Sequence, residues 1–390
     1  MRLVSNEKIL EIQTKMKQAD YDMLLLFSPE ELVMAIDYFP FWGKSICLIP
    51  TSGSPLLIVP TNEPPFKQKM NYTVITYNTE SELILLIQQE FEKMTKEKIS
   101  LGASLLPKNT SVTASGAEQG NLSQSFWLQL KENAFLNLID CTSLIVECLK
   151  TKSITAINKM RTAHEIVEQG IDVFYSLLDT PITESELKLK IEHAINLQVL
   201  AFDVTYINSW AQIQSGKNSL VSGIYNTTST KQLNKGELVM LELAVCVDGY
   251  WVDLSRTGVV GIATTTQLRH YQSLKKAQNV IYSHIKPGMT FKELYNLSKE
   301  VLKKQHLDHL FPHPLGHGVG YQYHEPFEGI HSNSSTLVEE GMILTIEPGI
   351  YGEEIGGGMR VEENILVTST GCQLLSYPRE LNGGMTIERI

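Results

Sequence analysis

Two carboxylates, Glu242 and Asp253, lie eleven residues apart in a segment with the pattern of a β-hairpin. Asp248-Gly249, between two apolar runs, is the strongest two-residue signal for a hairpin turn. With these residues in the turn, Ala244 pairs with Asp253, so Glu242 is a diagonal neighbour of Asp253 on the same face, about 7–8 Å away between backbones. Burying both is costly unless a partner such as a metal ion compensates their charge. Taken alone, the segment favours an exposed polar face instead.

Histidines gather in the following segment, where six of the ten lie between His306 and His331. His317 stands between two glycines, which allow close approach of the backbone to a bound group. His313 precedes it and His324 follows it, the latter in a His-Glu-Pro sequence. Because imidazole is both the commonest metal-binding nitrogen and the usual proton carrier, this cluster is a candidate site. The alternative interpretation is a surface loop rich in histidine.

Two more carboxylates belong to the last strands of the chain. Glu347 ends an apolar run directly before Pro348-Gly349, and Glu362 lies between apolar residues two positions after Arg360. Glu362 alone would usually be solvated. Glu347 interrupts a run otherwise suited to a core, which favours a functional role.

The order of these motifs resembles the creatinase, prolidase and aminopeptidase P family. The shared pattern is a carboxylate, an Asp eleven residues later, Gly-His-Gly, His-Glu-x-Pro, Glu-Pro-Gly and Arg-x-Glu. The resemblance covers essentially the whole chain and implies a mixed α/β (α+β) fold. A small N-terminal α/β domain of the creatinase type is expected over residues 1–150, followed by a pita-bread catalytic domain with pseudo-twofold symmetry over 151–390.

The resemblance also implies an activity, the metal-dependent hydrolysis of a C–N bond in a dipeptide-like substrate such as Xaa-Pro. One or two divalent ions are expected per chain. A carboxylate-rich shell with one imidazole favours manganese over zinc or cobalt. Glu347 stands at the position of the family's general base, and His324 and His313 match histidines that donate to the substrate carboxylate or the oxyanion. The implied metal ligands are Glu242, Asp253, His317, Glu347 and Glu362.

Two positions depart from the peptidases of this family. The first metal ligand is Asp in those enzymes, whereas this chain has Glu242, which is one methylene longer. We therefore expect the second metal position, beside Glu242 and Asp253, to be the looser one. The peptidases also carry a His soon after the segment matching Gly216 to Asn218, and no His occurs there or near Gly223.

These departures leave two other functions open. One is a creatinase-like or ectoine-hydrolase-like enzyme that acts on a small non-peptide metabolite, since the stretch around Glu242 also resembles ectoine-hydrolase-like relatives. The other is a non-catalytic pita-bread protein that acts as a binding partner. It ranks lowest because four of the five implied ligand positions are unchanged.

The elements that must position these residues follow from hydrophobic periodicity. A helix is predicted from Ser153 onward with His164 on its buried stripe, where we interpret this residue as a hydrogen-bonded core or interface histidine rather than a ligand. Capping boxes at Thr183 and Thr290 predict the starts of two more helices. In the N-terminal half, the predicted strands are Met23–Phe27, Ser45–Ile49, Leu56–Val59 and Val74–Tyr77, and the predicted helices are Asn6–Ala19, Glu82–Met94 and Gln124–Asn133.

Bulk composition limits the partners and the compartment. A length of 390 residues favours two domains, and a net charge of −10 argues against nucleic acid as a partner. Five scattered cysteines without a CxxC pair predict a cytoplasmic protein, and no apolar segment approaches the length of a membrane span. The resemblance implies a homodimer whose N-terminal domain covers the partner's site, with Phe41 and Trp42 as candidate contributors.

Overall fold

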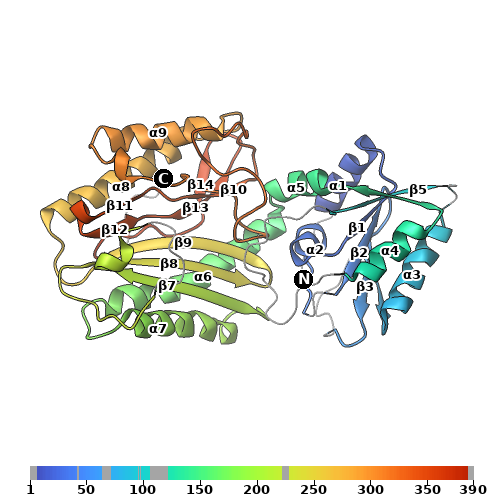
Figure 1. Ribbon diagram of the computed structural model, residues 1–390, viewed down its shortest axis with the longest axis horizontal. Coiled ribbons are helices and arrows are strands. Elements are labelled where there is room, and N and C mark those ends of the chain that lie inside the picture. The colour runs from blue at the N-terminus through green and yellow to red at the C-terminus, as the bar shows by residue number, and fades with distance from the viewer. Residues whose placement is uncertain are drawn as a thin grey trace. The chain divides into compact units, whose positions relative to one another are not determined.

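The computed structural model describes residues 7–41, 44–63, 72–94, 96, 98–105, 122–221 and 228–384. The chain forms two compact units, Met1–Ala156 and Ile157–Ile390. Figure 1 shows their helices and strands. Trp42 and the segment around Gly223 lie outside the described residues. In the described part of the chain, no helix is both long enough and apolar enough to span a bilayer.

The first unit contains a six-stranded mixed sheet in the order β4-β3-β2-β1-β5-β6. Its central strands β1, β2 and β3 pair antiparallel, and β4, β5 and β6 join in parallel. The four predicted strands are confirmed as β1 to β4, and β5 and β6 were not predicted. The strands are β1 Met23–Leu26, β2 Ile46–Pro50, β3 Leu56–Pro60, β4 Thr73–Tyr77, β5 Ile99–Ala103 and β6 Leu136–Asp140.

In the described part of this unit, five helices flank the sheet, and α3 and α4 lie together on one face (Figure 1). Ile87, Phe91 and Phe126 from these two helices pack with Leu25 and Leu48 of the strands in one core. The helices are α1 Glu7–Gln18, α2 Pro29–Ile36, α3 Glu80–Glu92, α4 Gln124–Glu132 and α5 Thr142–Lys150. Among the described residues of this unit, no group of His, Cys, Asp and Glu has the spacing of a metal site.

The second unit contains three sheets, ordered β7-β8-β9, β10-β13-β14 and β11-β12. Its strands are β7 Ile207–Ser215, β8 Leu238–Val247, β9 Tyr250–Val259, β10 Ile343–Ile346, β11 Gly349–Gly352, β12 Gly357–Arg360, β13 Glu363–Val367 and β14 Cys372–Leu374. Its helices are α6 Ile154–Leu177, α7 Glu184–Asn196, α8 Thr265–His284 and α9 Phe291–Lys303, with short 3-10 helices at Leu197–Leu200, Gly216–Ser219, Asp308–Leu310 and Glu353–Ile355.

The second unit repeats the order of two helices followed by strands. Figure 1 shows α6 and α7 beside the β7-β8-β9 sheet, and α8 and α9 beside the later strands. Thr183 and Thr290 cap the second helix of each pair with the predicted capping box. Each threonine also forms an isolated antiparallel bridge, to Gln232 and Leu337 respectively. These matching positions agree with the predicted pseudo-twofold layout.

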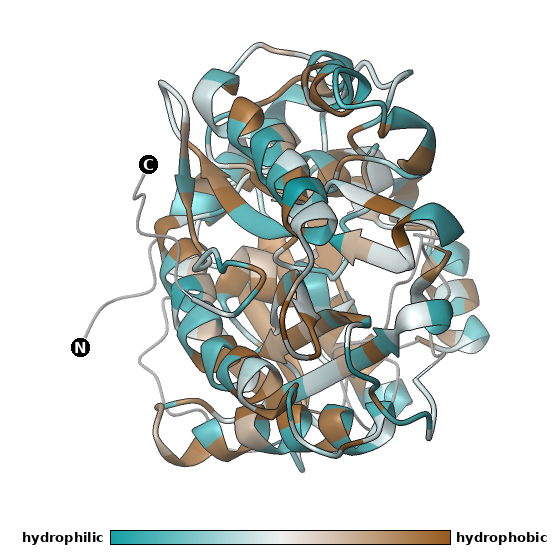
Figure 2. Ribbon diagram, turned by 90° about the vertical axis from the view of Figure 1, so that its left-hand side faces the viewer, coloured by the Kyte–Doolittle hydropathy of each residue, from teal (hydrophilic) through white to brown (hydrophobic). Residues whose placement is uncertain are grey.

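Amphipathic helices close the unit around its core. Helix α9 buries Phe291, Leu294 and Leu302, which lie on one face of the helix and belong to the core of α8, α9 and the last strands. Figure 2, seen from the left-hand side of Figure 1, shows hydrophobic and hydrophilic residues alternating along the helices.

His164 is buried in α6, as predicted, at 1% exposure. The expectation that it is hydrogen-bonded is wrong, because neither ring nitrogen has a hydrogen-bond partner in the part of the chain that the structure describes. Burial and the nearby Arg256 lower the pKa of His164 to about 3, so the ring is neutral near pH 7. A neutral ring costs less to bury than an imidazolium, although it still gives up its hydrogen bonds to water.

Candidate metal centre

The β8–β9 hairpin places Glu242 and Asp253 on one buried face. Its turn is Asp248-Gly249, with φ angles of 49° and 89°, which fit the positive-φ turn that tight hairpins favour. Ala244 pairs with Asp253 and Glu242 lies opposite Ser255, so the predicted register is confirmed. Every residue of both strands is buried. The alternative of an exposed polar face is therefore excluded.

The loop that carries His317 runs alongside β10. The amide of Thr345 donates to the carbonyl oxygen of His317 at 2.9 Å, and the amide of Glu347 donates to that of Leu315 at 2.8 Å. The amide of His317 in turn donates to the Thr345 hydroxyl at 3.0 Å. These bonds bring His317 to the end of the strand that Glu347 follows.

Gly316 is required for this close packing. A Cβ on Gly316 would lie 1.9 Å from the carbonyl oxygen of Thr345, a distance that no side chain tolerates. The missing side chain at Gly316 therefore makes room for the backbone of β10.

We expect Gly316→Ala to lower the free energy of unfolding by about 3 kcal/mol, the upper part of the usual range for overpacking, because backbone rather than a flexible side chain blocks the new methyl group. Urea denaturation followed by circular dichroism measures the change. Gly371→Ala is the matched control, since the Ile285 carbonyl oxygen, its nearest neighbour among the described residues, would lie 3.8 Å from the new Cβ. Equal stability of the two variants would contradict this account of the loop.

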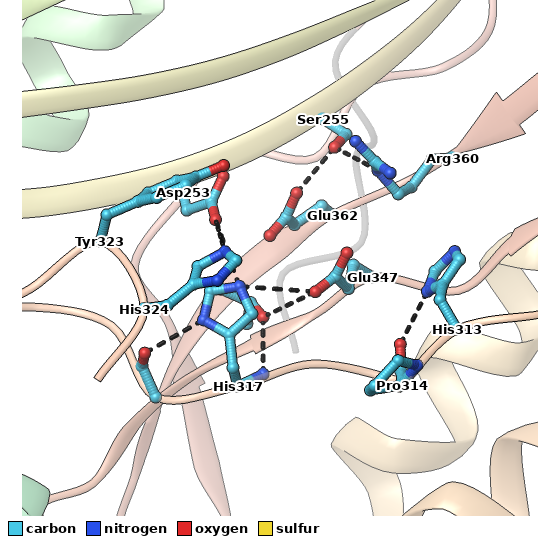
Figure 3. A network of polar contacts seen from close by, with 12 residues as sticks. Asp253, Ser255, His313, Pro314, His317, Tyr323, His324, Glu347, Arg360 and Glu362 are labelled. Atoms are coloured by element: carbon cyan, nitrogen blue, oxygen red, sulfur yellow. Dashed lines mark hydrogen bonds and ion pairs between the residues drawn. The ribbon is translucent and has the colours of Figure 1, made fainter. Parts of the chain in front are cut away.

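Asp253, His317, Glu347 and Glu362, four of the five predicted ligands, lie close together in Figure 3, and the fifth, Glu242, forms a group with Asp253 and Glu362. His317 Nε2 lies 3.3 Å from Asp253 Oδ2 and 3.5 Å from Glu347 Oε1. Ligand atoms of His317, Glu347 and Glu362 lie within 4.8 Å of one another. The Nδ1 of His317 donates to the carbonyl oxygen of Gly318 at 3.0 Å. That bond fixes the ring so that Nε2 is the atom facing the carboxylates.

The carboxylates of this cluster lack sufficient positive charge nearby. Asp253 is 1% exposed and Glu362 is fully buried. Burial, followed by the neighbouring carboxylates, raises the pKa of Asp253 and of Glu362 well above the ordinary values. Asp253 Oδ1 and Glu362 Oε1 have no hydrogen-bond partner among the described residues. Buried carboxylates that each keep an unpartnered oxygen beside an imidazole nitrogen fit a bound divalent cation.

The two other predicted histidines differ in their placement. His324 Nε2 lies 3.9 Å from Asp253 Oδ2, and its ring stacks on Tyr323 at a centroid distance of 4.4 Å. His313 lies beyond Glu347 in Figure 3, donates from Nδ1 to the Pro314 carbonyl oxygen at 2.7 Å and accepts at Nε2 from the Tyr351 hydroxyl at 3.1 Å. Burial lowers the pKa of both histidines below the ordinary value, so both rings are neutral near pH 7.

Three further residues hold the acids in place. The Ser255 hydroxyl lies 2.5 Å from Glu242 Oε2 and 2.7 Å from Glu362 Oε2. Arg360 forms a buried ion pair with Glu242, and the Tyr323 hydroxyl donates to Glu242 Oε1 at 3.0 Å. Sequence reasoning gave none of them a role. Strand alternation was an available signal for Ser255, because it lies two residues from a predicted ligand and so on the same face.

Residues 158–369 match the family model described as metallopeptidase family M24. The chain belongs to metallopeptidase family M24. The chain is 31% identical to a Xaa-Pro dipeptidase of Pyrococcus furiosus, over 66% of this chain and 72% of that protein. An uncharacterized peptidase of Staphylococcus aureus is 30% identical over 61% of this chain and 66% of its own length. The alignments thus span about two thirds of these relatives.

Solved M24 structures cover nearly the whole chain. The prolidase of Pyrococcus horikoshii matches with a TM-score of 0.74 and 26% identity, covering 96% of this chain and 99% of that one. The prolidase of Pyrococcus furiosus matches with a TM-score of 0.73 and 25% identity, covering 94% and 100% respectively. The family and the fold class predicted from the motifs are therefore confirmed, and with them the expected class of enzyme, a metallopeptidase.

Proposed function

We propose that this chain is a metal-dependent dipeptidase that hydrolyses Xaa-Pro or a closely similar dipeptide. The observation that carries the proposal is the grouping of His317, Glu347 and Glu362 beside Asp253, with an oxygen of Asp253 and one of Glu362 that have no hydrogen-bond partner among the described residues. The similarity to a Xaa-Pro dipeptidase and to solved prolidases supports the dipeptide as the substrate class.

These four side chains are the ones that would hold the metal. A bound divalent ion supplies polarisation of the scissile carbonyl and a water of lowered pKa. Glu347 is the proposed general base, and burial raises the pKa of its carboxyl above the ordinary value, which suits a group that must accept and release a proton. Its Oε1 also lies 3.4 Å from the Thr345 hydroxyl, which orients it.

His324 and His313 are the proposed donors to the substrate carboxylate or the oxyanion. Because their pKa values are lowered, both rings are neutral near pH 7. Each ring therefore has one N–H to donate. His324 is 44% exposed at its side chain and lies beside Asp253, which supports contact with a bound substrate. His313 uses Nδ1 for the Pro314 carbonyl oxygen, so its contact with a substrate would require an exchange of partners at Nε2.

The proposed ion is manganese, because three carboxylates with one imidazole form a hard, oxygen-rich shell. Zinc and cobalt are the alternatives. We expect EDTA-treated protein to melt at a lower temperature and Mn²⁺ to restore the original value, since a ligand of the folded state at 100 times its Kd stabilises by about 2.7 kcal/mol. Differential scanning calorimetry with and without each metal measures this. A melting temperature that stays the same after EDTA treatment and after addition of each metal would contradict a metal centre.

The substrate is tested with metal-reconstituted protein on a matched panel. Xaa-Pro dipeptides should be cleaved. Xaa-Ala dipeptides, which lack the proline ring, test the need for that ring. Tripeptides that begin with Xaa-Pro, in which the proline has no free carboxylate, test the need for the carboxylate. Creatine and acetylated diamino acids represent the small non-peptide metabolites. Turnover of these compounds without turnover of any dipeptide would replace the proposed function by the non-peptide alternative.

The remaining proposals concern assembly and compartment. We propose a homodimer in which residues 1–150 contribute to recognition of the substrate and 151–390 to catalysis. The family resemblance and the exposed Phe41, at 52%, support a surface contact of the N-terminal part. All five cysteines are free thiols, which supports a reducing, cytoplasmic location. Light scattering after gel filtration tests the dimer, and a monomer at micromolar concentration would contradict it.

A further inference from the structure

Glu242 differs from its neighbours in how its oxygens are used. Its Oε1 accepts from the Tyr323 hydroxyl at 3.0 Å, and its Oε2 forms the ion pair with Arg360. Asp253 Oδ1 and Glu362 Oε1, in contrast, have no partner within the described ranges. Each oxygen of Glu242 therefore has a donor from the protein, whereas one oxygen of Asp253 and one of Glu362 have none among the described residues.

The hydrogen bonds of the Ser255 hydroxyl also distinguish Glu242 from Glu362. It has a single proton but lies within hydrogen-bond distance of both Glu242 and Glu362, at 2.5 and 2.7 Å. Because Glu242 has Arg360 and Tyr323, this proton is needed at Glu362 Oε2. That leaves Glu362 Oε1 as the oxygen facing the cluster.

Among the described residues, Arg360 forms its ion pair with Glu242, and the carboxylates of Glu347 and Glu362 are also close enough to raise the pKa of its guanidinium. Its Nε donates to the Ser255 oxygen at 2.7 Å and one terminal nitrogen donates to the Tyr351 hydroxyl at 3.2 Å, so its planar fork is fixed. Arg360 is 7% exposed. An ion that took Glu242 as a ligand would compete with this guanidinium and weaken the pairing of a buried cation.

The competing arrangement is a second ion among Glu242, Asp253 and Glu362, whose ligand atoms lie within 4.8 Å of one another. It would require Glu242 to release the Tyr323 hydroxyl or to share an oxygen with Arg360. The protein donors already at both oxygens of Glu242 favour the arrangement without that ion.

We propose that the site binds a single divalent ion among Asp253, His317, Glu347 and Glu362, and that Arg360 and Tyr323 hold Glu242 as a positioning carboxylate that is not a metal ligand. The inference rests on the proposed function. With Glu242 balanced by Arg360, three carboxylates and one divalent ion leave an excess of one negative charge. The ammonium group of a dipeptide would balance it, whereas an uncharged or acidic substrate would not.

The test is the number of ions bound by the full-length protein. EDTA-treated wild type is dialysed against Mn²⁺, its manganese is measured by mass spectrometry, and its electron paramagnetic resonance spectrum distinguishes isolated from coupled Mn²⁺. We expect one ion per chain and an uncoupled spectrum. Tyr323→Phe frees Glu242 Oε1, so we expect it to bind a second ion at high Mn²⁺ with a coupled spectrum. The control is Tyr282→Phe, which removes a buried hydroxyl that has no partner in the described part of the chain; it should bind one.

Each outcome bears on a different statement. Two coupled ions in wild type, with dipeptidase activity, would overturn this inference and leave the proposed function standing. No bound ion and no hydrolysis of any dipeptide would overturn the proposed function. One ion in both wild type and Tyr323→Phe would overturn the role of Tyr323. If Tyr323→Phe fails to fold, Glu242→Asp, which withdraws the carboxylate from the Tyr323 hydroxyl, gives the same comparison with the same expected second ion.

Discussion

Glu347→Gln should fold normally and lose at least about 100-fold in kcat, since general-base catalysis is worth about 10²–10⁴-fold. Gln keeps the shape of the side chain and can still accept the hydrogen bond from the Thr345 hydroxyl, which lies 3.4 Å from Oε1. It cannot accept a proton from water. The side chain is only 14% exposed, so a solvent base would not easily take its place.

The measurement is steady-state hydrolysis of a Xaa-Pro dipeptide, with the metal content and the melting temperature of the same samples. Metal content is needed because Glu347 is also a proposed ligand, and reduced occupancy would lower the rate by another route. Glu353→Gln is the matched control, since Glu353 is exposed and lies six residues further along the chain. A metal-loaded Glu347→Gln variant with more than about a tenth of the wild-type rate would contradict the role of general base.

Arg256→Met should lower the free energy of unfolding by about 3–5 kcal/mol, the usual effect of removing one partner of a buried ion pair. Arg256 is 2% exposed and its guanidinium lies 3.1 Å from Glu363. It also donates to the carbonyl oxygens of Ser255 at 3.0 Å, Glu362 at 2.7 Å and Tyr377 at 3.2 Å. Arg256, in β9, therefore connects this strand to Glu362, the residue directly before β13.

Urea denaturation of wild type and variant measures this effect. The double variant Arg256→Met with Glu363→Met is the control, because replacing a buried ion pair by apolar residues of similar volume is often neutral. It should recover a large part of the lost stability, though not the hydrogen bonds to the three carbonyl oxygens. A loss below about 1 kcal/mol in the single variant would place Arg256 among ordinary surface pairs and contradict its structural role.

The sequence predicted the elements that carry strong local signals. Asp248-Gly249 determined the register of the β8–β9 hairpin, because a two-residue turn leaves one pairing for the flanking strands. The Thr183 and Thr290 capping boxes determined two helix starts. Strands β5 and β6 were missed. The predicted strands of the N-terminal half were marked by short apolar runs, whereas Ile99–Ala103 and Leu136–Asp140 alternate apolar and polar residues beside weak turn signals.

The site was predictable in its ligand types and not in its charge balance. Asp253, Glu347 and Glu362 follow from motif order, and the structure brings them to His317. The pairing of Arg360 with Glu242 depends on how β12 approaches β8, a long-range contact that no local pattern encodes. For the same reason, sequence reasoning assigned His164 a hydrogen-bond partner that the surroundings of α6 do not supply among the described residues.

The most direct test of the metal centre is a crystal structure of the Mn²⁺-reconstituted protein with anomalous data collected on both sides of the manganese edge. We predict one anomalous peak, within coordination distance of His317 Nε2 and of the carboxylates of Asp253, Glu347 and Glu362, with Glu242 still paired to Arg360. The absence of any peak among these four side chains in fully reconstituted protein, or a peak elsewhere in the chain instead, would contradict the account.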